Sequence, residues 1–328
     1  MTIQSFASSR FFLLKRVPFF LFAISLLLTA CDQQESTVDR NRAVDLQGHR
    51  GARGDRPENT LPAFLYCMEQ KMTTLELDTV VTRDKQLIVY HDTNLNGKLC
   101  LDANGNPAES IPIKNLSVEE LKTYDCGSLV NEDFPDMKTV PGTRLSTLNE
   151  VFKLAKNFEN QHNIKPRFLY NIELKFAENH SQQEVDEAAR LMVKAIEDAD
   201  LTEYVTVQCF VMEMLPAVRK LNPNLKLSAL FQPTIPQGIR LMIGFKANSD
   251  EILQKAIKAG ANVISPYYLY IKPDFVKASH AANLEVLPWV VNDADKMTKM
   301  MNLNVDGIIT DYPKLLFETY QDWKSSSL

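Results

Sequence analysis

The sequence predicts an α/β fold in which a parallel sheet closes into a TIM (β/α)8 barrel, and two observations support this. From Val44 onward, short apolar runs alternate with longer amphipathic stretches, the pattern of strands connected by helices. Eight strand-like runs can be counted, and eight strand–helix units imply a closed barrel. A chain of 328 residues is long enough for one large domain of this kind.

The eight expected strands are short and rich in aliphatic and β-branched residues. In chain order they are residues 44–48, 75–81, 168–174, 205–210, 225–231, 263–268, 286–291 and 307–312. In the stretches between them, apolar residues recur at helical spacing. These expected helices are residues 61–71, 146–158, 181–198, 212–221, 251–260, 272–282 and 293–302, with a short helix after the last strand. Asn59 or Thr60 is expected to cap the first helix.

One further strand-like run, residues 86–92, does not fit the count. Four residues separate it from the second strand, and a parallel crossover needs a dozen or more. We therefore expect an antiparallel hairpin that returns His91 to the C-terminal mouth of the barrel. Residues 93–144 then form an insertion rich in Asn, Asp, Gly and Pro, and so long a loop is typical of a functional cap. The barrel with this insertion is expected to span residues 44–328.

The first 43 residues are not expected to belong to the barrel. A positively charged start precedes an uncharged apolar run, residues 17–30, with the layout of an export signal. The run ends in LLTAC, which resembles a bacterial lipobox. The resemblance implies that residues 1–30 are a lipoprotein signal peptide, that Cys31 carries a lipid and that residues 31–43 are a flexible tether. The protein would then lie on the periplasmic side of a bacterial membrane, which it contacts through the anchor only. An unmodified cysteine near an ordinary cleavage site is the alternative.

Net charge and cysteine content limit the possible partners, disulfides and metal sites. The formal net charge of −5 argues against a nucleic-acid partner. An exported protein meets oxidising conditions, so the four cysteines after Cys31 could form disulfides, with three possible full pairings. Cys67 and Cys209 are expected to be core thiols, and Cys100 and Cys126 are the best candidate bridge. The cysteines do not show the spacing of a zinc site.

Acidic side chains are expected to gather where the strands end. Glu76 and Asp78 lie two residues apart on one strand, so both point to the same side, and Glu173 ends the next barrel strand. Three converging carboxylates suit one hard divalent cation, Ca²⁺ or Mg²⁺. The rival interpretation is ion pairing without metal, through Lys175 or Arg50.

Two of the five histidines also fall at the expected mouth. His49 follows the first strand and His91 ends the hairpin, so the pair is suited to general acid–base chemistry near neutral pH. Arg50 offers a planar fork for a phosphate group. Gly48 and Gly51 allow the tight turn around it, whereas Arg53 and Arg56 are expected on the loop surface.

Taken together, the motifs GHRG…PENTLPAF, LELD, VYHD, NIELK and GIITDYP resemble the glycerophosphodiester phosphodiesterases over residues 44–313. The family also carries an insertion after the HD motif. The resemblance implies that His49 and His91 are the acid–base pair, Arg50 and Lys175 contact phosphate, Glu76, Asp78 and Glu173 hold the metal, and Trp289 borders the substrate. The chain departs from the family's usual pattern at residues 208–210 and at Val290, which puts the alcohol or glycerol pocket in doubt.

The implied reaction is metal-dependent hydrolysis of a small glycerophosphodiester, such as glycerophosphocholine or glycerophosphoethanolamine, to glycerol 3-phosphate and an alcohol. The nucleophile could be water or the glycerol 2-hydroxyl. A phospholipase acting on intact lipid is one alternative, although it would need an apolar rim beside the mouth. A catalytically inert binding lipoprotein is the other.

Overall fold

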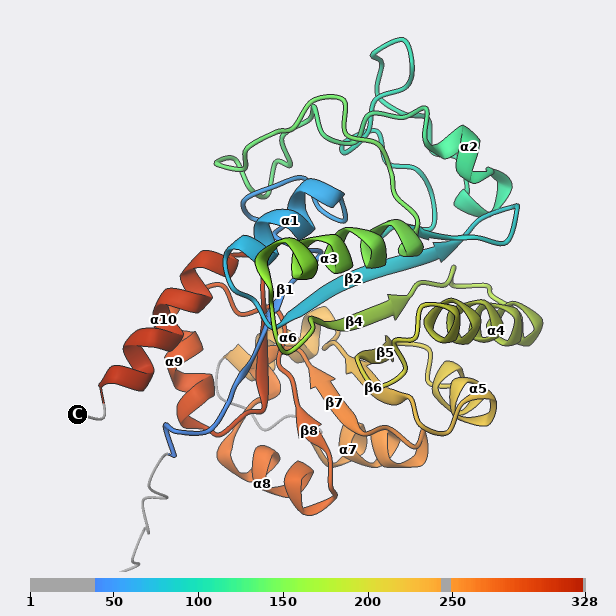
Figure 1. The fold of residues 1–328 in the computed structure, drawn as a ribbon. Coiled ribbons are helices and arrows are strands. Elements are labelled where there is room, and N and C mark those ends of the chain that lie inside the picture. The colour runs from blue at the N-terminus through green and yellow to red at the C-terminus, as the bar shows by residue number, and fades with distance from the viewer. Residues whose placement is uncertain (1–38, 243–248, 327–328) are drawn as a thin grey trace, which may run out of the picture. The chain divides into compact units, whose positions relative to one another are not determined.

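In the computed structural model, which describes residues 39–242 and 249–326, eight parallel strands form a nearly closed barrel (Figure 1). The strands are β1 (Asp45–Gly48), β2 (Thr74–Val81), β4 (Leu169–Leu174), β5 (Val205–Cys209), β6 (Lys226–Phe231), β7 (Val263–Pro266), β8 (Glu285–Val286) and β9 (Gly307–Thr310). They pair in the order β8-β7-β6-β5-β4-β2-β1-β9. Two backbone hydrogen bonds join the residues that follow β8 to β9. Val291 N–H donates to Ile309 O, and Ile309 N–H donates to Pro288 O. The predicted TIM barrel is confirmed.

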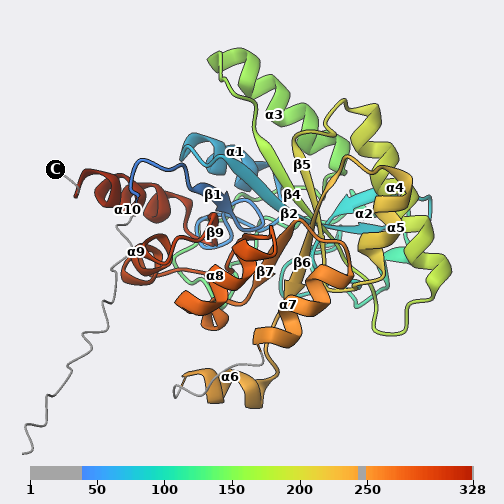
Figure 2. The ribbon, with the colours of Figure 1, turned by 90° about the horizontal axis from the view of Figure 1, so that it is seen from below.

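Helices surround these strands, as the view in Figure 2 shows. They are α1 (Leu61–Glu69), α3 (Leu148–His162), α4 (Gln182–Asp198), α5 (Met214–Leu221), α6 (Ile235–Met242), α7 (Ser249–Lys258), α8 (Pro273–Ala281), α9 (Ala294–Asn302) and α10 (Pro313–Ser325). Thr60 caps α1 by accepting from Ala63 N–H, so of the two expected caps the threonine is used. The short α6 was not expected, because its sequence contains a proline and a glycine. Within the described residues, no helix combines the length and hydrophobicity needed to cross a bilayer.

The predicted hairpin is confirmed. β3 (Leu87–Val89) pairs antiparallel with the end of β2, with Thr79 opposite Val89. Beyond the paired residues, Tyr90 N–H donates to Asp78 O at 3.1 Å. The hairpin therefore returns the next residue, His91, along β2 to the level of Asp78.

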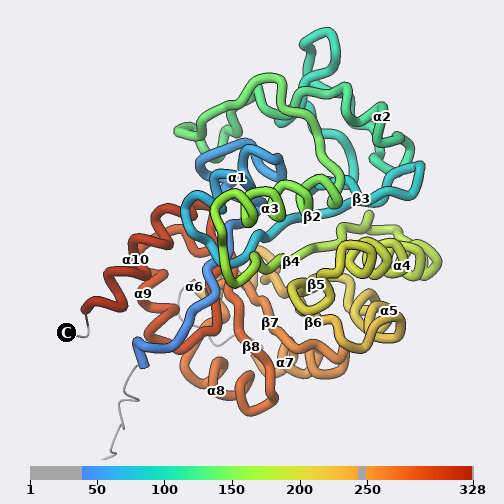
Figure 3. Tube along the Cα trace, viewed as in Figure 1, coloured from blue at the N-terminus to red at the C-terminus, as the bar shows by residue number. Residues whose placement is uncertain are grey.

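Between β3 and α3, residues 93–144 form a segment with little regular structure, seen in cyan to green in Figure 3. It contains η1 (Ile113–Asn115) and α2 (Val118–Leu121), and the Cys100–Cys126 disulfide crosses it, so the predicted bridge is confirmed. A small second core joins this segment to the β2–β3 hairpin; its members are Val80, Ile88, Tyr90, Leu95, Cys100, Ala108, Ile113, Leu121, Cys126 and Leu145. Cys67 and Cys209 are buried thiols, as predicted.

The inner face of the barrel carries polar side chains toward both ends of the strands: Asn171 donates to Gln47 and Gln47 to Asp45 toward the amino ends, and the acids lie nearer the carboxyl ends. Every residue of β2 is buried except the last, and two of those buried residues are acids. Unpaired buried charges are costly, so such residues require partners or a bound ion. The carboxyl ends of the strands are where a barrel of this class places its functional groups.

Candidate active site

The turn after β1 places His49 and Arg50 at the carboxyl end of the barrel. Two left-handed residues, Arg50 at φ +50° and Gly51 at φ +81°, reverse the chain there. A Cβ on Gly51 would lie 2.8 Å from the backbone carbon of Ala63, and one on Gly48 would lie 2.1 Å from Gly51 O. Both glycines are therefore needed for the close packing of this turn against α1.

His49 forms a buried pair with Asp311, which follows β9. Nδ1 of His49 lies 2.6 Å from Oδ1 of Asp311. Burial alone would raise the pKa of Asp311, but the charge and hydrogen bond of His49 and the charge of Arg53 hold it at about 2. The ionised carboxylate can only accept, so Nδ1 carries the proton and Nε2 keeps its lone pair.

Burial also keeps the His49 imidazole neutral. It lowers the pKa of His49 below its ordinary value, and the nearby Asp311 carboxylate only partly opposes this effect. His49 lines the cavity at the mouth of the barrel. A neutral imidazole with a fixed tautomer is suited to accept a proton there.

The three predicted acids converge, since Glu76 and Asp78 share a face of β2 and Glu173 pairs with Asp78 in the parallel register of β4. One carboxylate oxygen from each lies within 4.8 Å of the others, and all three side chains are buried. Lys175 Nζ lies 2.7 Å from Glu173 Oε1 and 3.2 Å from Asp78 Oδ1. Arg50 Nε lies 3.2 Å from Asp78 Oδ2. The acids therefore converge as a metal site requires, and they also form the ion pairs of the rival interpretation.

The pKa values of the three acids indicate that Arg50 and Lys175 do not fully offset the negative charge of the cluster. Burial, followed by the charge of Asp78, raises the pKa of Glu76 well above its usual range. Burial raises the pKa of Glu173 to about 7, although Lys175 opposes it. At Asp78, Lys175 and Arg50 outweigh burial and lower the pKa. A buried set of oxygen donors with surplus negative charge fits a hard divalent cation.

His91 contributes the second imidazole. Its Nδ1 lies 2.7 Å from Asp92 Oδ1, and Asp92 Oδ2 accepts from Asn96 Nδ2. His91 lines the same cavity as His49, with a volume of about 480 Å³. Lys175 and Arg50 line it as well, so the predicted acid–base and phosphate-contacting residues share one cavity.

Arg53 corrects one prediction. It was expected on the loop surface, but it lines the cavity, with Nε 3.2 Å from Asp311 Oδ1. Its guanidinium carbon lies 4.6 Å from the ring centre of Phe134, which comes from the insertion. The loop coils like a helical turn, so that the backbone N–H of Arg53 donates to His49 O. The four-residue spacing of Arg53 from His49 is the sequence signal that could have placed Arg53 at the cavity. Arg56 packs on Tyr66, outside the cavity lining.

The opposite wall of the cavity is aromatic. The Trp289 ring meets Phe210 and Tyr267 edge to face, at 5.6 and 5.7 Å between centroids. Trp289 Nε1 donates to Ser265 O. At the positions where the chain departs from the resembled motifs, Gln208 Nε2 donates to Glu76 Oε1, and Val290 lines the cavity. Cys31, the remaining predicted site residue, lies outside the described residues.

Comparisons with known proteins place this site in a family. The sequence model of the glycerophosphoryl diester phosphodiesterase family matches residues 49–315. A glycerophosphodiester phosphodiesterase of Caldanaerobacter subterraneus is 30% identical over 82% of this chain and 94% of its own. A lysophospholipase D of Rattus norvegicus is 26% identical over 82% of this chain and 84% of its own. The chain belongs to the glycerophosphoryl diester phosphodiesterase family, and the prediction of an enzyme of this family is confirmed.

Solved structures agree on the fold. A putative glycerophosphoryl diester phosphodiesterase of Silicibacter pomeroyi covers 85% of this chain and 94% of its own, with 27% identity and a TM-score of 0.76. A phosphodiesterase of Oleispira antarctica, solved with its product sn-glycerol 3-phosphate, covers 84% and 96%. It has 20% identity and a TM-score of 0.64.

Proposed function

We propose that this protein hydrolyses small glycerophosphodiesters to sn-glycerol 3-phosphate and an alcohol, with the help of one divalent cation. One observation carries the proposal: two imidazoles, two carboxylates of a three-acid cluster and three basic side chains line the same cavity of about 480 Å³. Acid–base groups beside a cluster of acids that can hold a cation suit phosphoryl transfer to a hydroxyl. The product found with the Oleispira antarctica phosphodiesterase supports the same substrate class.

Glu76, Asp78 and Glu173 would hold the cation, Ca²⁺ or Mg²⁺. Bound there, it would supply positive charge to the phosphoryl oxygens as negative charge develops on them. Arg50 and Lys175, which already contact these acids, are placed to bind the remaining phosphoryl oxygens. Arg53 adds a third basic group from the side of Asp311.

The two histidines divide the proton transfers. His49, neutral and fixed by Asp311, takes the proton from the attacking hydroxyl as the new oxygen–phosphorus bond forms. The bond from phosphorus to the alcohol oxygen breaks, and His91 gives a proton to that oxygen. Water or the glycerol 2-hydroxyl can be the nucleophile, and a cyclic glycerol phosphate detected by ³¹P NMR would identify the second route.

The test is turnover of purified protein with glycerophosphocholine and glycerophosphoethanolamine, with Ca²⁺ or Mg²⁺ added and glycerol 3-phosphate measured. Chelation should abolish the activity and readdition of cation should restore it. His49→Ala and His91→Ala should each remove nearly all turnover while the Tm stays close to that of the parent. Absence of glycerol 3-phosphate with every glycerophosphodiester would reject the proposal and favour the inert binding lipoprotein.

An acylated lipid is the second candidate substrate, and one observation favours it. α6 begins three residues after Gln232, which lines the cavity, and α6 packs against η2 (Tyr268–Tyr270) beyond β7. Ile235, Ile239 and Met242 on α6 are 83%, 53% and 68% exposed. These residues provide an apolar rim that the insertion lacks. Comparing turnover of phospholipid vesicles with turnover of the deacylated headgroup separates the two substrates.

We also propose the predicted export and anchoring: residues 1–30 as a signal peptide, Cys31 as the lipidated residue, residues 31–43 as a tether and residues 44–328 as the barrel domain. The Cys100–Cys126 disulfide supports an oxidising compartment such as the periplasm. Metabolic labelling with palmitate should mark the parent protein and not Cys31→Ser, and membrane fractionation should then lose the variant. An unlabelled parent protein would reject the anchor.

A further inference from the structure

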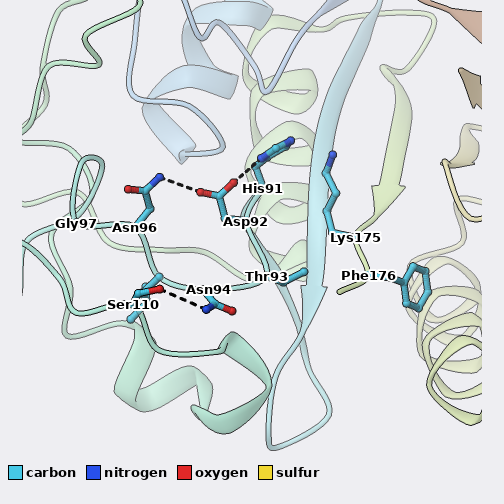
Figure 4. Close-up of a pocket in the computed structure, with 10 residues that line it drawn as sticks. His91, Asp92, Thr93, Asn94, Asn96, Gly97, Ser110, Lys175 and Phe176 are labelled. Atoms are coloured by element: carbon cyan, nitrogen blue, oxygen red, sulfur yellow. Dashed lines mark hydrogen bonds and ion pairs between the residues drawn. The ribbon is translucent and has the colours of Figure 1, made fainter. Parts of the chain in front are cut away.

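A second cavity of about 540 Å³ adjoins the one that holds the acid cluster (Figure 4). His91 and Lys175 line both cavities, so they stand at the boundary between them. The rest of the second lining comes from Asp92, from the start of the insertion, residues 93–97, and from Ser110 and Phe176. The reaction as proposed above does not use this cavity.

We propose that this second cavity binds the alcohol that leaves, and that it selects a neutral polyol such as inositol or glycerol. The inference rests on the proposed function, since it extends the same substrate beyond the scissile bond. The acids mark the phosphoryl position in the first cavity, and His91 marks the oxygen that departs. An alcohol attached to that oxygen then continues past His91 into the second cavity.

The lining of the second cavity carries the groups that bind hydroxyls. Asn94 Nδ2 donates to Ser110 Oγ at 3.3 Å, which leaves the Asn94 carbonyl oxygen to accept and the Ser110 hydroxyl hydrogen to donate. Thr93, a further residue with a hydroxyl, also belongs to the lining. Each hydroxyl of a polyol both donates and accepts, so it matches such mixed groups.

The same lining is poorly suited to a quaternary ammonium group, which is recognised by several aromatic faces. Phe176 supplies the aromatic ring among the described lining residues, and it lies 5.2 Å from the His180 ring, pointing away from His91 (Figure 4). The Lys175 ammonium at the boundary repels a cation. The Asp92 carboxylate, hydrogen-bonded to His91 and Asn96, is the acid of this lining and acts in the other direction.

The experiment compares kcat/KM for glycerophosphoinositol with kcat/KM for glycerophosphocholine, measured with the same cation. The parent protein should prefer the inositol substrate by about fivefold or more, the value of one or two hydrogen bonds between neutral groups. Asn94→Ala and Ser110→Ala should each reduce this preference several-fold. Asn104→Ala, an exposed asparagine at a turn of the same insertion and outside this lining, is the matched control and should keep the ratio of the parent.

Equal kcat/KM values, a preference for the choline substrate, or variants that reduce both substrates by the same factor would overturn the inference and leave the proposed function standing. Failure of the parent to turn over any glycerophosphodiester would instead overturn the proposed function, and this inference with it. Unchanged Tm values of the two variants ensure that a lost preference reflects the cavity.

Discussion

Asp311 organises three side chains of the site with two carboxylate oxygens. Oδ1 accepts from His49 and lies 3.2 Å from Arg53 Nε, while Oδ2 accepts from Asn292 Nδ2 at 2.6 Å. The carboxylate thereby sets the tautomer of His49 and holds Arg53 at the cavity. One buried anion thus couples the proposed proton acceptor to a basic group that lines the cavity.

Asp311→Asn tests this coupling. An amide can present its N–H to His49 and reverse the tautomer, so kcat should fall at least about 100-fold. In the parent, His49 must be neutral to act, so kcat/KM should fall as pH drops through a pKa below about 6.5. The Asp311 charge raises the His49 pKa, so its loss should move this acid limb to still lower pH. A pH–rate profile like that of the parent would contradict the assignment.

Arg53→Ala and Arg56→Ala form a matched pair, because the two arginines lie three residues apart in the same loop. Arg53 lines the cavity and Arg56 lies on Tyr66. Loss of a charged hydrogen-bond donor to phosphate is worth about 1.5–3 kcal/mol, so Arg53→Ala should lower kcat/KM by roughly 10- to 100-fold. Arg56→Ala should stay near the parent value in the same assay. Equal effects of the two changes would argue against phosphate contact by Arg53.

At the scale of elements, short turns at the strand ends decide where the functional groups lie. The turn after β1 places His49, and the β2–β3 hairpin places His91. The insertion is held by its own small core and by the Cys100–Cys126 disulfide. These local constraints orient the groups before the substrate binds.

Gly51→Ala and Gly105→Ala separate steric clash from backbone strain. Both glycines have φ near +80°, but a Cβ meets the Ala63 backbone at Gly51 and finds nothing within 4 Å at Gly105. Gly105→Ala should therefore cost about 1 kcal/mol of unfolding free energy, and Gly51→Ala clearly more. Gly51→Ala should also lower kcat, because it displaces His49. Urea unfolding and turnover check this, and equal costs at the two sites would refute the packing argument.

Removing the disulfide should destabilise the protein. Cys100→Ser combined with Cys126→Ser frees a loop of 26-residue separation, for which chain entropy gives about 3–4 kcal/mol. The Tm should fall in the double variant, and reductant should lower the Tm of the parent but not of the variant. If reductant leaves the Tm of the parent unchanged, the bridge contributes little to stability.

At the scale of the whole barrel, the polar mouth is a concentration of buried charge. Glu58, Glu76, Asp78 and Glu173 surround Arg50 and Lys175, and Arg50 NH1 lies 2.6 Å from Glu58. Burial of surplus carboxylates opposes folding unless protons or a cation offset the charge. A bound divalent ion would therefore stabilise the folded barrel as well as serve the reaction.

Thermal unfolding with and without added cation tests this link. An ion at 100 times its Kd stabilises a folded protein by about 2.7 kcal/mol, so Ca²⁺ or Mg²⁺ should raise the Tm by several degrees. Glu173→Gln removes one of the three carboxylates, so the shift should largely disappear. The absence of a shift with either ion in the parent would count against a cation site at these acids.

Much of this protein follows from the sequence because the signals are local. Strand and helix periodicity predicted the eight-stranded barrel, the short connection predicted the hairpin, and the spacing of Glu76 and Asp78 placed both on one face. The shared loop-rich segment of Cys100 and Cys126 also favoured their bridge among three pairings, whereas the packing of the hairpin against the insertion required distances through space. So did the contact of Arg53 with Asp311, the exposed face of α6, and the boundary between two cavities at His91 and Lys175. These features join residues far apart in the chain, and only the closed barrel and the packing of its loops set the distances between them.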